Sequence, residues 1–336
     1  MTWKKLKKDI YYYEKPSLGQ LKQSVRYMAL TVDKSTLKNK IKYGLAREIT
    51  KSKGNPDVAG FIDESKLIIV KSKDLLNWKK VCDLKIKGIN KIIKSLGKKN
   101  RFFIGLEDPD IIVNNKTKHV YFTIAFKLKD KIAYNVYLGH AQGKSLDNLK
   151  ATKPVLSPTK NFRGFKELAF SPYKIKNKRI CLNESQIIRK NEEIQLIVST
   201  ISAKFGKPWK PFKIVLEPAK AKYKWIQGHA SPCKIFPTKF INHKGLLVGI
   251  INGREKNKGK KYGKFRPGLI LFNPKTGEIP WVSPKPLFED PKARTITFAS
   301  DLIQINKDEI ILYCHVNDSF VRAYKINKKA IEKLIS

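Results

Sequence analysis

Short runs of apolar and β-branched residues, separated by polar turns, recur along most of the chain. One run covers residues 110–113, turns at residues 114–117 and returns at residues 119–125. Runs of this kind, bounded by Asn, Gly, Pro or Lys, are typical of β-strands joined in antiparallel hairpins. The pattern predicts an all-β protein that ends in a short amphipathic helix over residues 327–336.

The strand runs return in a fixed order, in rounds that begin near residues 57, 110, 169, 231 and 299. A repeated unit of about three or four antiparallel strands is the signature of a propeller blade. The rounds therefore predict a five-bladed β-propeller that forms a single domain over residues 1–336. Residues 1–56 are the least regular part and belong either to the first blade or to an N-terminal extension. A β-sandwich or a two-domain β protein is the alternative.

The chain is strongly basic, with a formal net charge of +42 over 336 residues. Only 10 of its 70 basic residues are Arg, and the Lys residues extend from Lys4 to Lys333 without clustering in a tail. Sequence-specific nucleic-acid contacts commonly use the Arg fork. We therefore expect no specific nucleic-acid partner, and only a salt-sensitive attraction to anionic glycans or other polyanions.

Features of the whole chain indicate a cytoplasmic protein. Its basic start lacks the apolar core of a signal peptide, and no apolar run approaches the roughly 18 residues of a membrane span. Four cysteines, Cys82, Cys181, Cys233 and Cys314, are far apart and form no CxxC pair. Reduced, buried thiols are the simplest interpretation. The oligomeric state stays open.

The densest group of carboxylates is Glu107-Asp108-Pro109-Asp110, directly before an apolar strand. Like charges this close repel, so burial would raise the pKa of at least one of them. Carboxyl groups with separated pKa values are what acid–base catalysis uses. The alternative is a solvated loop that enters a strand.

In a propeller, the first strand of each blade lines the central channel, so residues at the strand entrances share one pocket. This rule gathers several carboxylates and one histidine, as glycoside cleavage requires: one acid protonates the leaving oxygen and a base activates water. The base of the first blade is either Asp57 or Asp33. The residues gathered are Asp57, Glu107, Asp108, Asp110, Glu167, His229, Ser231, Ser300 and Asp301.

Three motifs carry a family resemblance. Residues 105–109 resemble the Glu-Asp-Pro segment of the β-mannoside phosphorylases, and residues 72–78 resemble a Ser-x-Asp-Leu-x-x-Trp blade edge. Gly228-His229-Ala-Ser231 is similar to a Gly-His-x-Ser motif of the fourth blade. From about residue 57 to 326, the chain thus resembles the five-bladed propeller glycosidases of glycoside hydrolase families 43 and 130.

The resemblance implies roles for individual residues. Asp108 matches the proton donor of the phosphorylases and the family 43 aspartate that positions substrate. Glu167 falls where family 43 carries its general acid, and His229 falls on the propeller axis, where a structural cation is possible. Arg254 is a candidate for binding a substrate hydroxyl or phosphate. The catalytic set is then Asp108, Glu167 and Asp57, and the substrate-binding set is Glu107, Asp110, His229, Ser231, Arg254 and Asp301.

We therefore predict a glycoside hydrolase that acts on a short oligosaccharide without a cofactor or catalytic metal. The β-mannoside phosphorylases usually have Arg after Glu-Asp-Pro, whereas this chain has Asp110, whose charge would repel phosphate. Phosphorolysis of a β-mannoside is nevertheless the alternative within the same superfamily. A non-catalytic propeller that binds glycans or polyanions is the alternative from another class.

Overall fold

A computed structural model describes residues 2–20, 25–58, 60–98, 100–129, 134–189, 192–202 and 204–336. The chain is mostly β-strand, as predicted, and its strands form sheets of five, nine, four and four strands. The described residues also form two α-helices, α1 (Ile89–Leu96) and the predicted C-terminal α2 (Lys328–Ile335). Three short 3₁₀ helices cover Lys34–Thr36, Pro218–Lys220 and Lys224–Ile226.

The nine-stranded sheet consists of two antiparallel groups that meet at the parallel pair Ser65–Gly105. A Cβ atom at Gly105 would lie 2.4 Å from the Ser65 carbonyl oxygen, so this close approach requires glycine. The first group is β3 (Arg26–Val32), β4 (Lys42–Lys53), β5 (Ile62–Ser72) and β6 (Lys79–Asp83). The second is β8 (Arg101–Asn114), β9 (Thr117–Leu128), β10 (Tyr134–Gly143) and β11 (Leu149–Ala151), with β7 (Ile86–Lys87) beside β11.

The other three sheets follow in chain order. One contains β12 (Phe165–Ala169), β13 (Arg179–Arg189), β14 (Glu192–Ser202) and β15 (Lys210–Leu216). The next contains β16 (His229–Ile235), β17 (Leu247–Arg254), β18 (Phe265–Phe272) and β19 (Trp281–Val282). The last combines β20 (Thr297–Gln304), β21 (Glu309–Val316) and β22 (Phe320–Asn327) with the N-terminal β2 (Ile10–Tyr13) and β1 (Trp3–Lys7).

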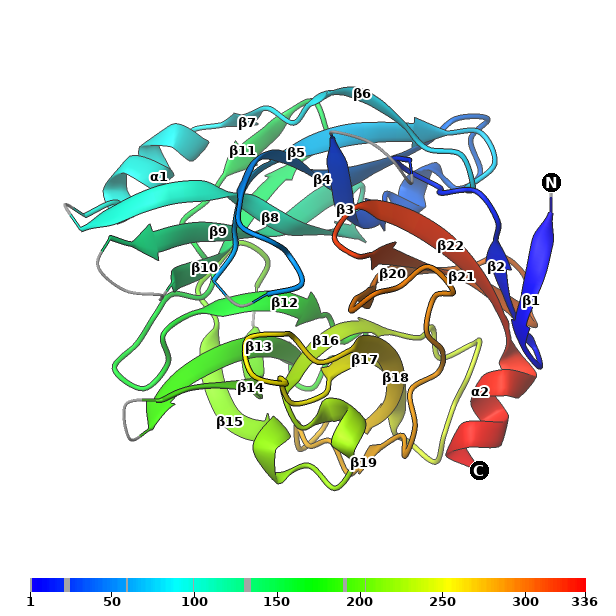
Figure 1. Ribbon diagram of the computed structural model, residues 1–336. Helices are drawn as coiled ribbons and strands as arrows, with labels where there is room; N and C mark the ends of the chain where they lie inside the picture. Colours follow the sequence, from blue (N-terminus) through cyan, green and yellow to red (C-terminus); the bar gives the residue numbers. More distant parts are fainter. Residues whose placement is uncertain are drawn as a thin grey trace.

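The first strands of the five antiparallel groups, β3, β8, β12, β16 and β20, contact one another in cyclic order, and β20 contacts β3. Figure 1 shows the sheets spread around these strands, with both chain ends on the same side of the molecule. The predicted start of the first round near residue 57 is wrong, because β3 begins at Arg26. Residues 1–56 thus contain β3 and β4 of the first group, and also β1 and β2, whose pairing with β22 has no signal in the local sequence.

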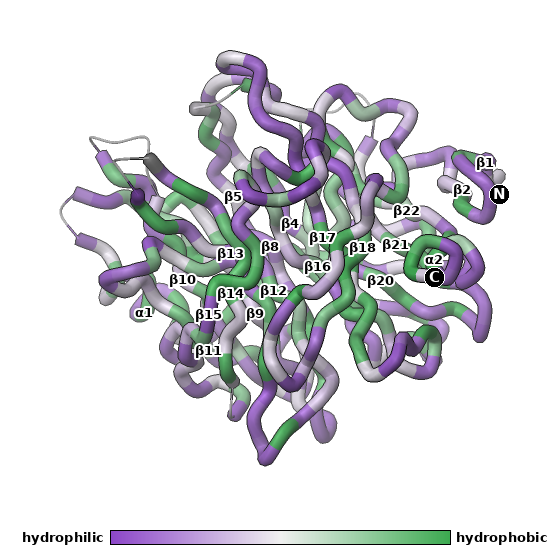
Figure 2. The backbone as a smooth tube through the Cα atoms, turned by 90° about the horizontal axis from the view of Figure 1, so that it is seen from below, coloured by the Kyte–Doolittle hydropathy of each residue, from purple (hydrophilic) through white to green (hydrophobic). Residues whose placement is uncertain are grey.

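Apolar side chains fill the spaces between neighbouring sheets. Ile250 and Leu269 of the fourth group pack with Leu312 and Tyr324 of the last sheet, and all four are fully buried. Figure 2 shows hydrophobic positions along the interior strands and hydrophilic positions along the peripheral loops. In the described part of the chain, no helix is long and apolar enough to cross a membrane.

Candidate active site

Each of the five first strands carries a β-bulge, where extra residues interrupt the pairing register. Ala29, Asp108 and Glu167 occupy three of these bulges, with φ angles of 51°, 48° and 48°. Non-glycine residues rarely adopt positive φ, and such strain concentrates at functional sites. The bulges turn these three residues toward the centre of the molecule, since all three line one cavity of 20 Å³ together with Lys234 and Ser300.

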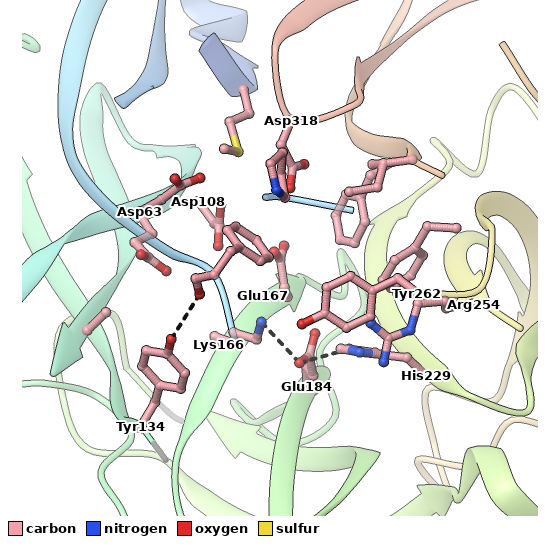
Figure 3. A pocket seen from close by; sticks show the side chains of 18 of the residues that line it. Asp63, Asp108, Tyr134, Lys166, Glu167, Glu184, His229, Arg254, Tyr262 and Asp318 are labelled. Carbon is pink, nitrogen blue, oxygen red and sulfur yellow. Dashed lines mark hydrogen bonds and ion pairs between the residues drawn. The ribbon is translucent and has the colours of Figure 1, made fainter. Parts of the chain in front are cut away.

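A larger cavity of 350 Å³ lies against the same carboxylates. It brings together five of the predicted residues, Glu107, Asp108, Glu167, His229 and Arg254, which come from four strands. Figure 3 shows Asp63 and Asp108 on one side of this pocket and Arg254 and His229 on the other, with Glu184 beside His229. The lining also contains residues that the sequence did not indicate, among them Arg47, Asp63, Tyr134, Lys166, Glu184, Tyr262, His315 and Asp318.

Glu167 has the ionisation behaviour of a proton donor. Burial raises its pKa well above the ordinary value, and the adjacent Asp108 raises it further by its charge and by a hydrogen bond. Asp108 and Glu167 line both the large and the small cavity, so the two carboxyl groups lie close together. The protonated form of Glu167 is therefore favoured.

Arg47 of β4 pairs with Glu107 and Asp108, the two members of the acidic segment that line the pocket. One guanidinium nitrogen lies 2.6 Å from Glu107 Oε1 and the other lies 3.4 Å from Asp108 Oδ1. Burial raises the pKa of Glu107 to about 7, because the nearby Arg47 offsets it only in part and Asp108 adds to it. The predicted raised pKa within this segment thus agrees with the structure.

Glu184 forms a buried charged group with Lys166 and His229. Its Oε1 lies 3.2 Å from Lys166 Nζ and 3.0 Å from His229 Nε2. Burial opposes ionisation of Glu184, but His229 and Lys166 outweigh it and lower its pKa to about 2. The ammonium of Lys166 therefore already supplies positive charge beside His229, where the sequence left room for a cation. In the described residues, no group of three or more His, Cys, Asp or Glu is arranged to hold a metal.

Arg254 is a half-buried cation that forms no ion pair in the described part of the chain, and its Nε has no hydrogen-bond partner there. Its guanidinium lies 4.6 Å from the ring centre of Tyr262 and 5.7 Å from that of Phe265. Stacking on aromatic rings leaves the edge of the guanidinium available to an anion or a polar ligand. Of the pocket residues, Arg254 is the one best suited to bind a negatively charged group.

Asp318 adds an ionised carboxylate to the pocket. His315 Nδ1 accepts a hydrogen bond from the Ala29 N–H at 3.4 Å, so its Nε2 carries the proton that faces Asp318 Oδ1 at 3.2 Å. Burial works against ionisation, but the contact with His315 lowers the pKa of Asp318. Asp318 sits in a hairpin turn, where a lone Asp gives no sequence signal. Glu184 does have a sequence signal, because residues 183–186 are a polar run inside an apolar strand.

Four predicted site residues lie outside this pocket, and the prediction for each is corrected. The Asp57 carboxylate accepts hydrogen bonds from Arg294 Nε at 2.8 Å and Thr295 Oγ1 at 2.5 Å, in the loop that precedes β20. Asp110 pairs with Lys234 beside the small cavity, and Ser231 is completely buried. Asp301 accepts hydrogen bonds from the backbone N–H groups of residues 32 and 302, each at 2.8 Å.

Two further predictions change with these positions. Asp33, the other candidate for the first base, is buried, pairs with Lys118 and accepts a hydrogen bond from the N–H of Ser35. The charge of Asp110 is balanced by Lys234 rather than presented to a ligand. The argument that Asp110 would repel phosphate from the pocket therefore does not apply.

A scan against protein-family models and a search of curated proteins gave no match. Among solved structures, the β-1,2-mannobiose phosphorylase from Listeria innocua is similar over 97% of this chain and 99% of its own, at 14% identity and a TM-score of 0.68. The protein has the fold of the propeller glycosidases. A mannose phosphorylase from Leishmania mexicana is similar over 94% of this chain and 88% of its own, at 14% identity and a TM-score of 0.56. A thermostable family-43 glycoside hydrolase matches 92% of each chain, at 12% identity and a TM-score of 0.55.

Proposed function

We propose that the protein is a single-domain, five-bladed propeller enzyme that cleaves glycosidic bonds in the 350 Å³ pocket. The cyclic contacts of the five first strands support this architecture. The observation that carries the function is Glu167, a half-buried carboxyl of the pocket whose pKa is raised well above its ordinary value by desolvation and by Asp108. A carboxyl that keeps its proton is the group that protonates the leaving oxygen of a glycoside. Asp108 lies beside it and favours its protonated form by its charge.

Hydrolysis further requires a base on the other side of the sugar to activate water. Asp108 does not fit this role, because it lies close to Glu167. The matching bulge of the first sheet holds Ala29, which has no ionisable group. Asp318, whose pKa is lowered, is the pocket carboxylate with the ionisation state of a base. Hydrolysis therefore assigns the acid to Glu167 and the base to Asp318.

Phosphorolysis is a second candidate, favoured by Arg254. Phosphate is itself an anionic nucleophile and needs no protein base. Phosphorolysis therefore does not require an ionisable group at the position of Ala29. The half-buried Arg254, which forms no ion pair among the described residues, suits a phosphate oxygen. The phosphorylases of Listeria innocua and Leishmania mexicana, which share the fold, support testing β-mannosides first.

The test is turnover of aryl glycosides and of β-1,2-mannobiose by the purified protein, with and without inorganic phosphate. Hydrolysis predicts release of free sugar without phosphate and its loss in Asp318→Asn. Phosphorolysis predicts a sugar 1-phosphate product and, in Arg254→Gln, a KM for phosphate raised about 10- to 100-fold, the share of one charged hydrogen bond. Arg189→Gln, on the surface, is the matched control and should change neither value. A folded protein with no turnover of any glycoside would instead favour the non-catalytic binding role.

Substrate, cofactor and location complete the proposal. The substrate is a short oligosaccharide, and neither route requires a cofactor. We retain a cytoplasmic location from the sequence, and fractionation of cells that express the protein would test it.

A further inference from the structure

Two loops from different sheets meet at the mouth of the pocket. One joins β4 to β5 and contributes Pro56 and Phe61 to the pocket lining. The other joins β17 to β18 and contributes Tyr262 and Gly263. The first loop belongs to the first group of strands and the second to the fourth, so their contact spans the centre of the molecule.

The contact between the two loops is specific. Val58 and Lys261 form an antiparallel β-bridge, and the Tyr262 N–H donates a hydrogen bond to the Asp57 carbonyl oxygen at 3.1 Å. The rings of Phe61 and Tyr262 meet edge to face, with their centres 6.2 Å apart and an interplanar angle of 80°. Backbone pairing and ring contact together make a continuous bridge from one loop to the other.

Asp57 anchors this bridge to a third element. Its carboxylate binds Arg294 and Thr295, in the loop that leads into β20. The Tyr134 hydroxyl of β10 lies 3.5 Å from the Phe61 carbonyl oxygen, on the opposite side of the pocket (Figure 3). These contacts give Asp57 a role that its prediction as a base did not foresee.

We propose that residues 57, 58 and 61, together with residues 261 and 262, form a strap that determines which glycans reach the site. The proposal rests on the proposed function. A bridge across the mouth blocks a glycan chain from lying through the pocket, so the site takes a chain end. The strap must part for each sugar to enter or leave, because its two halves join above the residues that perform the chemistry.

A disulfide tests whether the strap parts. Antiparallel partners have Cα atoms about 4.5–5.5 Å apart, within the range of about 4.4–6.8 Å that a disulfide spans. Val58→Cys/Lys261→Cys is made in a Cys82→Ser background, because Cys82 is the exposed thiol and the other three are buried. The oxidised double variant should turn over aryl glycosides at least tenfold more slowly than its dithiothreitol-reduced form, and each single variant should be insensitive to oxidation.

A second readout needs no glycoside. Phenylglyoxal modifies accessible arginines, and peptide mass spectrometry gives the rate at Arg254 inside the pocket and at the exposed Arg189. Oxidation of the double variant should slow modification of Arg254 at least tenfold and leave Arg189 unchanged. Equal rates at Arg254 in the oxidised and reduced forms would overturn the strap. If the wild type turns over no glycoside but oxidation of the double variant still slows modification of Arg254, the proposed function is refuted and the strap is supported.

The products of an end-labelled oligosaccharide test the selection of chain ends. The wild type should release one sugar unit at a time from one end of the chain. A mixture of internal fragments from the first turnovers would overturn this part of the proposal.

Discussion

Replacing Glu167 by Gln separates the chemistry of the site from its stability. Gln has nearly the same shape but carries no proton to donate. General acid catalysis contributes about 10²–10⁴-fold to a rate, so the variant should lose that factor in kcat, or about 3–5 kcal/mol of transition-state stabilisation. Glu64→Gln, a half-exposed Glu paired with Lys51, makes the same chemical change outside the pocket and should leave kcat unchanged.

The same variant, although less active than the wild type, should be more stable at neutral pH. Burial and Asp108 raise the pKa of Glu167, so the folded state holds this proton more tightly than the unfolded state does. The contribution of Glu167 to wild-type stability is therefore greatest at low pH and falls as pH rises through the ordinary glutamate range toward the folded pKa. Gln removes this fall, so the variant should be more stable than the wild type at neutral pH, in urea unfolding followed by tryptophan fluorescence.

The pH profile of kcat/KM completes the test. A donor works while it is protonated, so wild-type activity should decrease as pH rises through the raised pKa of Glu167. Glu167→Gln should have no such decrease. Near-normal turnover in the variant, or an unchanged alkaline decrease, would refute the assignment of Glu167 as the acid.

Two further substitutions test the structure around the site. Glu184→Gln removes the buried carboxylate that pairs with the half-buried Lys166, and should lower the free energy of unfolding by about 1–3 kcal/mol at neutral pH. Because the pKa of Glu184 is lowered to about 2, this deficit should shrink as pH falls from the ordinary glutamate range toward 2, and a constant deficit in urea titrations would count against the ion pair. Gly268→Ala places a Cβ atom 2.3 Å from the Trp225 ring and should destabilise by about 1–3 kcal/mol, whereas Gly97→Ala, with its nearest contact at 3.5 Å, should have little effect in the same assay.

The elements that the sequence predicted are those held by local contacts. Asp74 accepts hydrogen bonds from the N–H groups of Leu76 and Asn77, and Trp78 then enters the core, so residues 72–78 form a recognisable motif. Asp108 and Glu167 were noticed because each lies at the start of an apolar strand pattern. The propeller rule and the family resemblance then predicted a shared pocket, and Glu107, Asp108, Glu167, His229 and Arg254 do line one cavity.

The residues that sequence reasoning missed depend on contacts between distant segments. Asp57 was a candidate for the first base because the sequence left open whether residues 1–56 belong to the first blade, and the first bulge in fact holds Ala29. Arg47 reaches the pocket because β4 lies beside β8 in space. Asp318 is held by His315 of the preceding strand and gains its ionised state from burial and pairing, which no composition or spacing records.

The repeated bulges explain why one backbone can support different chemistry at equivalent positions. Ala29, Asp108 and Glu167 share a left-handed conformation in neighbouring first strands, and each contacts the same small central cavity. The geometry is thus a property of the repeat, whereas the chemistry depends on the side chain that each bulge carries. Under the proposed function, Asp108 and Glu167 form the proton-donating side of the pocket. The methyl group of Ala29 supplies no base at the first bulge, so the proposal has the nucleophile activated by Asp318 or already charged beside Arg254.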